Sequence, residues 1–140
     1  MATFQKFHSF TEAVTEKAHN LGSDNLKVML CLVAPLATNS VKADVTEIAP
    51  GNGYTAGGNT ATQASSAQTS GLYKLVLNDP ATWTAAGGPI AAFRYAVLYN
   101  NTAASQELIG FWDYGSSVNL VSGDSFTVDF SPTNGVLTLS

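Results

Sequence analysis

Charged residues are scarce in this chain of 140 residues. Asp, Glu, Lys and Arg make up 11% of it, less than half the share of about 25% found in ordinary globular domains. The surface must therefore depend on Ser, Thr, Asn, Gln and Gly for solubility. Such a surface loses little hydration when another protein covers it, because few charges have to be stripped of water. This composition favours a protein that packs against partners.

Positive charge is the scarcer sign. Six Lys and Arg residues stand against ten Asp and Glu residues, and the formal net charge is −4. The basic residues all lie within residues 1–94 and form no cluster. The electrostatic attraction that supplies most nucleic-acid affinity is therefore missing, and we expect no direct binding to nucleic acid.

Cysteine and long apolar runs are nearly absent. Cys31 is the single cysteine, so no internal disulfide can form, and its place in the run NLKVMLCLVA predicts a buried thiol. No stretch of about 18 apolar residues occurs, and the N-terminus lacks the apolar centre of a signal peptide. We expect a protein that is made in the cytoplasm and does not associate with membranes.

Recognisable patterns of catalytic or metal-binding residues are missing too. No serine lies in a Gly-x-Ser-x-Gly motif. Asp113, Asp124 and Asp129 do not have the spacing of a calcium loop, and His8 and His19 form no known zinc pattern. The sequence therefore predicts a protein that is not an enzyme and that holds no cofactor or metal.

A glycine-rich stretch, PGNGYTAGGN, begins at Pro50. Gly51, Gly53 and Ala56 match a loose form of the dinucleotide-binding motif, which works only where a strand precedes it and a helix begins within it. Here a proline precedes the motif, and a run of small residues broken by glycines follows. We therefore interpret residues 36–62 as a long surface loop that can adapt to a partner.

Near the N-terminus lies the only helical signal. Ser9 and Glu12 have the spacing of a capping box, and apolar residues then recur at three- and four-residue intervals, which predicts a helix over residues 10–20. Phe4 and Phe7 precede it. They have two interpretations, packing against the core, which we favour, or docking on a neighbouring molecule.

The rest of the chain has the pattern of β-strands. Residues 25–33 are apolar on both faces, as in a strand that is buried on both sides or lies under the helix. The pair Asn134-Gly135 predicts a hairpin between the last two strands. Other strands are expected at residues 72–78, 82–84, 90–100, 107–115, 125–131 and 135–140.

These patterns predict a mainly β fold, an antiparallel β-sandwich or jelly roll with one short N-terminal α-helix. The whole chain, residues 1–140, is expected to form a single domain. Residues 1–22 make its N-terminal segment, and residues 23–140 make the β-sandwich with its long loop.

Aromatic residues in the second half have two interpretations, a flat platform for stacking on sugars or a core with an interface. Strand alternation places Phe93, Tyr95 and Tyr99 on one face and directs Phe111 and Trp112 to opposite faces, which favours the core. Sugar stacking stays open for Trp112 and Tyr114.

Five stretches spread over nearly the whole chain carry a resemblance. They are HNLGSDNLKVMLCL, ADVTEIAPGNGYTAGGN, YKLVLNDPATWTAAGG, FRYAVLYNN and LIGFWDYGSSVNLVSGDSFTVDF. Together they resemble small virion proteins of tailed bacteriophages, of the capsid decoration or cement class. The resemblance implies a structural protein on the capsid exterior, bound to the major capsid protein and to copies of itself as a dimer or trimer. It implies no catalytic residue.

The expected function is therefore non-enzymatic stabilisation of a phage capsid by bridging its subunits. Phe4, Phe7 and Tyr54 are the expected partner contacts, chosen for their expected exposure. Two alternatives stay open. One is an adaptor or receptor-facing protein of the tail or head fibre, and the other is a carbohydrate-binding β-sandwich module.

Overall fold

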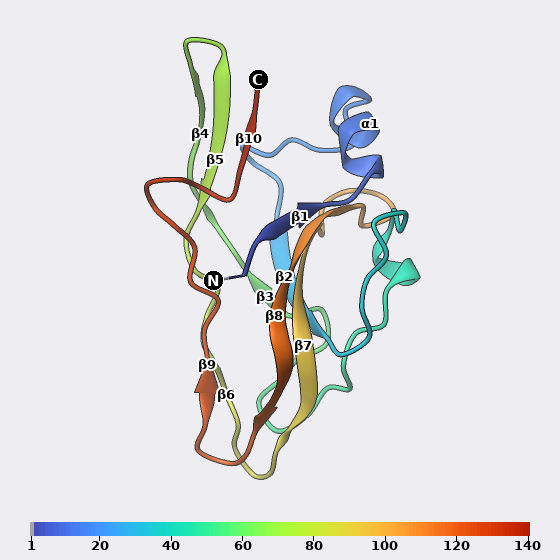
Figure 1. Cartoon of the computed structure of the whole chain (residues 1–140), viewed down its shortest axis with the longest axis vertical. Coiled ribbons are helices and arrows are strands. Elements are labelled where there is room, and N and C mark those ends of the chain that lie inside the picture. Colours follow the sequence, from blue (N-terminus) through green and yellow to red (C-terminus); the bar gives the residue numbers. More distant parts are fainter. Residues whose placement is uncertain (1) are drawn as a thin grey trace.

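The computed structural model describes residues 2–140, which form two β layers and one short helix (Figure 1). No helix among them is long and apolar enough to cross a membrane. The elements follow in the order β1 (Phe4–Lys6), α1 (Ser9–Thr15), β2 (Leu26–Cys31), the 3₁₀ turn η1 (Lys42–Asp44), β3 (Asn59–Thr60), β4 (Gln63–Thr69), β5 (Leu72–Leu77), β6 (Trp83–Thr84), β7 (Ile90–Asn100), β8 (Leu108–Leu120), β9 (Ser125–Phe126) and β10 (Leu137–Leu139).

One layer is a five-stranded sheet in the order β1-β8-β7-β2-β3. The other layer consists of a three-stranded sheet, β10-β5-β4, and the strand pair β6-β9. All strand pairs are antiparallel. The prediction of a mainly β antiparallel fold with one short N-terminal helix is confirmed, and the layering is that of a β-sandwich. Jelly-roll connectivity stays a prediction.

A large apolar core fills the space between the layers. It contains side chains from both sheets, from α1 and from the segments that connect them. Its most deeply buried large members are Trp83, Phe10, Phe93, Leu26, Leu30, Leu75, Leu98 and Ile109. Burying side chains of this size stabilises the fold by roughly 1.5–3 kcal/mol each.

A second, smaller core lies on the opposite face of the five-stranded sheet. Its members are Phe7, Met29, Cys31, Val97, Tyr99, Leu108 and Phe111, and Val45 from the long loop packs against them. Strand β2 is therefore buried on both sides, which was one of its two expected settings. The long loop and Phe7 cover its second face.

The helix differs from the prediction at both ends. It begins at Ser9, and its N-cap residue His8 makes no side-chain cap hydrogen bond, so the predicted capping box is wrong. The helix ends at Thr15, because Lys17 adopts a left-handed conformation with a φ of 69°. This turn directs His19 into the protein, where it is buried.

The predicted last hairpin is also wrong. Strand β10 pairs with β5, and residues 127–136 cross between the two halves of the outer layer without forming a strand. The hairpin of that layer joins β4 to β5 through Ser70 and Gly71, which both have positive φ, the requirement of a type I′ turn. Strand β4 escaped detection because six of its seven residues are exposed, so no apolar alternation marks it.

Candidate functional site

The long loop after β2 is fastened to the body of the protein. The carboxylate of Glu47 accepts hydrogen bonds from the hydroxyl of Tyr54 at 2.7 Å and from the N–H of Gly57, and it pairs with Lys42. The Tyr54 hydroxyl in turn accepts the N–H of Leu30 at 3.0 Å. Burial and the bond to Glu47 both raise the pKa of Tyr54. These contacts fasten residues 47–57 of the expected loop to β2, and the ability of the loop to adapt to a partner stays a prediction.

Glycine in this loop serves close backbone packing. Gly58 has a φ of +74°, and a Cβ atom there would lie 1.8 Å from the carbonyl oxygen of Val28 on β2. Neither a strand before the glycine-rich stretch nor a helix within it occurs in the described part of the chain. This stretch is a loop up to Gly58, which lets it lie against β2, but Asn59 and Thr60 at the end of the expected loop form strand β3.

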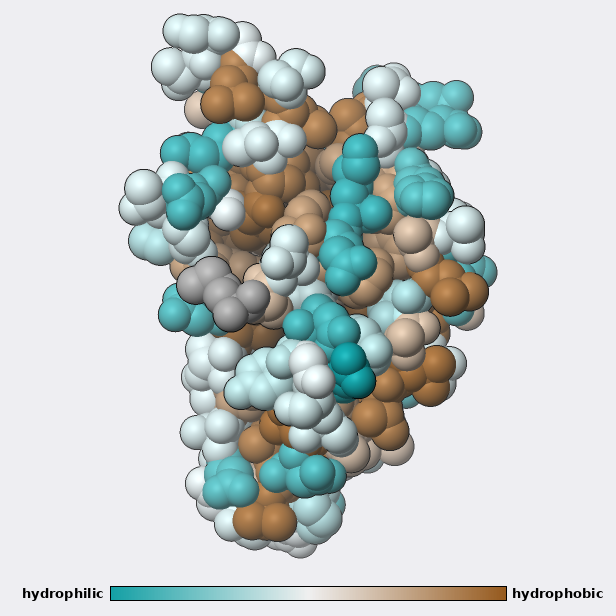
Figure 2. Space-filling model, in the orientation of Figure 1, coloured by the Kyte–Doolittle hydropathy of each residue, from teal (hydrophilic) through white to brown (hydrophobic). Residues whose placement is uncertain are grey.

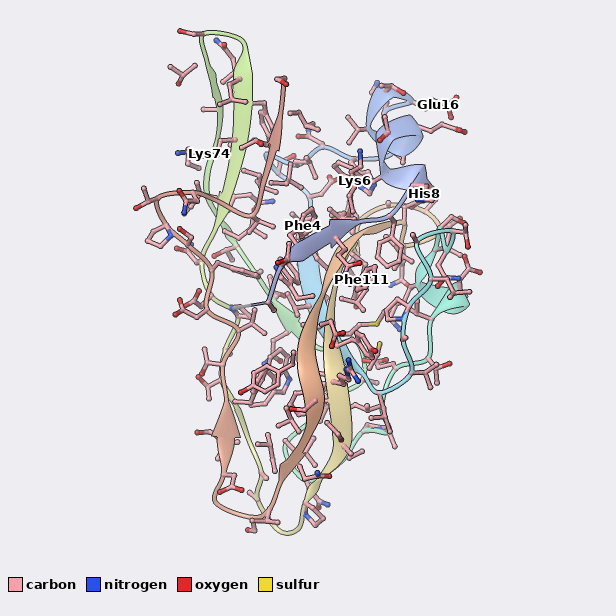
Figure 3. All side chains as sticks on the ribbon, viewed as in Figure 1. Phe4, Lys6, His8, Glu16, Lys74 and Phe111 are labelled. Atoms are coloured by element: carbon pink, nitrogen blue, oxygen red, sulfur yellow. The ribbon has the colours of Figure 1, made fainter. Side chains whose placement is uncertain are left out.

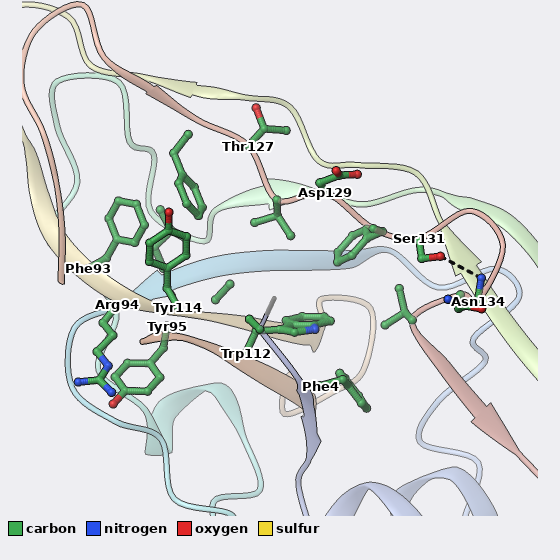
Figure 4. Close-up of a pocket in the computed structure, with 18 residues that line it drawn as sticks. Phe4, Phe93, Arg94, Tyr95, Trp112, Tyr114, Thr127, Asp129, Ser131 and Asn134 are labelled. Atoms are coloured by element: carbon green, nitrogen blue, oxygen red, sulfur yellow. Dashed lines mark hydrogen bonds between the residues drawn. The ribbon is translucent and has the colours of Figure 1, made fainter. Parts of the chain in front are cut away.

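The three expected partner contacts lie in separate places. Phe7 is fully buried in the second core, with its ring 5.1 Å from that of Phe111, and Tyr54 is 2% exposed. The expectation that these two side chains are exposed is therefore wrong, and the core interpretation of Phe7 is confirmed. Phe4 is half-buried on β1 (Figure 3). Its ring lies 5.2 Å from that of Trp112 (Figure 4).

Three of the six exposed large apolar side chains lie together in the segment that follows β2, Leu32–Leu36. Leu32, Val33 and Leu36 are 47%, 61% and 63% exposed, Ala34 is exposed as well, and Pro35 is buried. Figure 2 shows hydrophobic side chains at the surface on the side of the molecule where this loop runs. We call these five residues the apolar segment.

Local hydrogen bonds hold the apolar segment in place. The N–H of Leu36 donates to the side-chain oxygen of Asn39 at 2.7 Å, and the N–H of Asn39 donates back to the carbonyl of Leu36. Ala37 accepts the N–H of His8 at 2.9 Å. This surface gives no separate signal in the sequence, because the run NLKVMLCLVA is continuously apolar although its buried part ends at Cys31. Pro35 is the only local signal for that change.

A second candidate is a cavity of about 370 Å³ between β8 and residues 126–136 (Figure 4). Aromatic rings dominate its walls. They belong to Phe4, Phe93, Tyr95, Trp112, Tyr114, Phe126 and Phe130. Its size lies within the usual range of ligand pockets, roughly 300–1,000 Å³.

The rings around this aromatic cavity are tilted against one another. The planes of Phe4 and Trp112 meet at 56°, those of Trp112 and Phe130 at 41°, and those of Tyr114 and Phe126 at 73°. Trp112 itself is half-buried. The flat, exposed platform that sugar stacking on Trp112 requires is therefore not formed. Tyr114 is 59% exposed, and sugar stacking on its ring stays a prediction.

One ion pair lies at the end of the aromatic cavity. Arg94 binds both carboxylate oxygens of Asp113, at 2.7 and 3.0 Å, and this pairing together with the N–H of Gly115 lowers the pKa of Asp113.

Register shifts on either side of Phe93 place its ring in the main core, whereas Tyr95 packs against the second core. The expectation that both rings share a face is wrong, because the irregularity reverses the alternation.

The single cysteine is buried, as expected. Cys31 is fully enclosed in the second core, and burial raises the pKa of its thiol to about 12. Within residues 2–140, no group of three or more His, Cys, Asp or Glu side chains is arranged to hold a metal ion.

Comparison with known proteins yields no relative: no protein-family model, no curated protein and no solved structure matches this chain.

Proposed function

We propose that this protein is a non-enzymatic structural protein of a phage virion, which decorates the capsid exterior and stabilises it by bridging subunits of the major capsid protein. The exposed apolar segment is the observation that carries this proposal, together with the sequence resemblance. Contiguous apolar surface of this kind is typical of protein–protein contacts. The chain as a whole is poor in charge, so that covering its surface removes little hydration.

The binding free energy expected from the apolar segment is modest. Leu32, Val33 and Leu36 are each about half exposed, and covering what remains of them would contribute about 3 kcal/mol. A contact of that size is weak for a single copy in solution. Repeated over a shell, and linked through copies that touch one another, it becomes strong by multivalency.

Contact between copies is the second part of the proposal. Strand β4 lies at the edge of its sheet, six of its seven residues are exposed, and its sequence QASSAQT has no charge and no proline. Uncharged edges of this kind pair readily with another strand. Two copies of β4 that meet antiparallel about a two-fold axis place uncharged residues opposite uncharged residues, so no charge repulsion opposes a dimer with two-fold symmetry.

The test of attachment uses heads of the encoding phage that lack this protein. Adding wild-type protein should restore regular density on the shell in electron cryomicroscopy and raise the temperature at which the heads release DNA. The triple variant Leu32→Ser/Val33→Ser/Leu36→Ser should do neither. Leu72→Ser/Val121→Ser, which changes exposed apolar residues elsewhere, is the control and should behave as wild type.

Either of two results would contradict this reading. The first is that heads lacking the protein show no missing density and resist heat as well as wild-type heads. The second is that the triple variant attaches normally. Density on the tail or a head fibre in place of the shell favours the adaptor alternative.

Self-association is tested separately by light scattering during gel filtration. Ala67→Lys brings a positive charge from each copy close to the middle of the β4 pair and should convert a dimer to a monomer. Ser122→Lys adds the same charge at an exposed turn and should leave the dimer intact. A wild-type protein that is monomeric at high concentration refutes the β4 contact.

A further inference from the structure

The aromatic cavity between β8 and residues 126–136 is too large to be a packing fault. A well-packed core has few voids bigger than a water molecule, whereas this cavity has a volume of about 370 Å³ and is partly enclosed. Its walls are mainly aromatic. Concave, mostly apolar recesses of this size are typical ligand sites.

The positive charge at the end of the cavity is already neutralised. Arg94 lines the cavity, but its guanidinium group binds both carboxylate oxygens of Asp113, at 2.7 and 3.0 Å. A paired guanidinium offers little attraction to an anionic ligand, and the carboxylate of the same pair opposes one. This end of the cavity therefore selects for no charge.

Along residues 126–130, apolar side chains face the cavity and polar side chains face away from it. The apolar ones pack against the main core and are Phe126, Val128 and Phe130. Thr127 and Asp129, which alternate with them, are exposed. Figure 4 shows both side chains directed away from Trp112. The carboxylate of Asp129 is therefore not available to a cation inside the cavity.

The wall of the cavity contains no buried polar group that lacks a partner. Within residues 2–140, the buried side-chain nitrogen and oxygen atoms without a hydrogen bond belong to His19, Trp83 and Glu107, and none of these residues lines the cavity. A charged or strongly polar group that entered would lose its hydration without gaining such a partner. The cavity is thus suited to a neutral, apolar guest.

One wall of the cavity is held by few backbone bonds. Residues 127–136 pair with no strand before β10 begins. Their N–H groups reach the rest of the fold at Phe130, which donates to the carboxylate of Asp79 at 2.7 Å, and at Val136, which donates to the carbonyl of Leu75 at 2.7 Å. This wall can move to admit a guest without breaking a sheet.

We propose that the aromatic cavity binds a neutral aromatic molecule of one or two rings. Benzene fits an apolar cavity of about 150 Å³, so a cavity of about 370 Å³ has room for such a guest. The tilted wall rings, such as those of Tyr114 and Phe126 at 73°, offer both edges and faces, which are the contacts that aromatic pairs prefer. The site shares no residue with the apolar segment or with β4, so this binding is independent of capsid attachment.

The experiment titrates the purified protein with toluene and follows backbone amide signals by two-dimensional NMR. Toluene should bind in the millimolar range or more tightly, and the shifted signals should lie in residues 93–96, 112–114 and 126–136. Benzoate and benzylammonium carry a charge on the same ring. Both should bind at least tenfold more weakly than toluene, because the cavity cannot replace the hydration of their charge.

Two tryptophan variants test the location of the site. Val128→Trp fills the cavity from a half-buried position in its wall and should weaken toluene binding at least tenfold. Val121→Trp is the matched control, because it adds the same side chain at a 59% exposed position that does not line the cavity. It should bind toluene as wild type does. The comparison of toluene with its charged counterparts uses the wild-type protein and does not depend on how the variants fold.

Four results would each overturn the proposal. They are the absence of amide shifts up to the solubility limit of toluene, shifts that surround another part of the protein, binding of benzoate or benzylammonium as tight as that of toluene, and unchanged binding in Val128→Trp. If toluene dissociates an oligomer of the wild-type protein, the cavity holds a side chain of a second copy, and the proposal also fails. None of these results bears on the variants that test capsid attachment.

Discussion

Removing the Glu47 carboxylate tests whether the long loop is held as the contacts indicate. In Glu47→Ala, the Tyr54 hydroxyl and the N–H of Gly57 both lose their acceptor, and Tyr54 is 2% exposed. Each bond to a charged acceptor contributes roughly 1.5–3 kcal/mol. The ion pair between Lys42 and Glu47, at 3.4 Å and partly exposed, is given no contribution to the free energy of unfolding.

The free energy of unfolding should therefore fall by about 3 kcal/mol, at the lower end of the range for two bonds because water can reach part of the site. For a domain of 140 residues this lowers Tm by about 10 °C. Urea unfolding and hydrogen exchange measure the change, and exchange should rise most over residues 47–58. Glu16→Ala, at an exposed position just after α1, is the control. If Glu47→Ala kept both the wild-type urea midpoint and the wild-type exchange over residues 47–58, the reasoning would fail.

Three further predictions concern other parts of the protein. Burial lowers the pKa of His19 although Glu107 and Asp24 raise it, so the unfolded chain binds the proton more readily. The free energy of unfolding should then fall as the pH drops below 6.5, the ordinary pKa of histidine, and His19 should add no pH dependence above it. In His19→Gln, urea unfolding should no longer show this pH dependence. Cys31, with a thiol pKa of about 12, should react with a disulfide reagent only when the protein is unfolded, and fast labelling of the native protein would contradict its burial. Gly58→Ala should destabilise the fold by at least about 2 kcal/mol in thermal melts, because it combines left-handed strain with a clash, whereas Gly71→Ala, at a positive φ but in open space, should lose only about 1 kcal/mol.

Apolar periodicity predicted the buried strands well. The run from Ile90 to Asn100 forms a strand with the expected ends, and β2 is buried on both faces. Strand β4 could not be found in this way, since its side chains face water and its place depends on pairing with β5. Hairpin chemistry failed at Asn134-Gly135 because the following strand pairs with a more distant part of the chain.

The candidate sites were harder to predict than the fold. Phe7 and Tyr54 belong to the same residue types as exposed contact residues, and only tertiary packing shows that they are interior. The reverse holds for Leu32 and Val33, which continue an apolar run past the end of their strand. The aromatic cavity brings Phe4 against Trp112, residues far apart in the sequence, and no local pattern announces such a contact.

The apolar segment continues directly from β2, which has mechanical consequences if it is the point of attachment. A pull on Leu32 would act along the axis of a strand that is paired with β7 over six residues. Tension in that direction shears all of these backbone bonds at once, whereas a pull across the strand would open them one after another. An anchor in this position would resist outward pressure far better than the same side chains on a free loop.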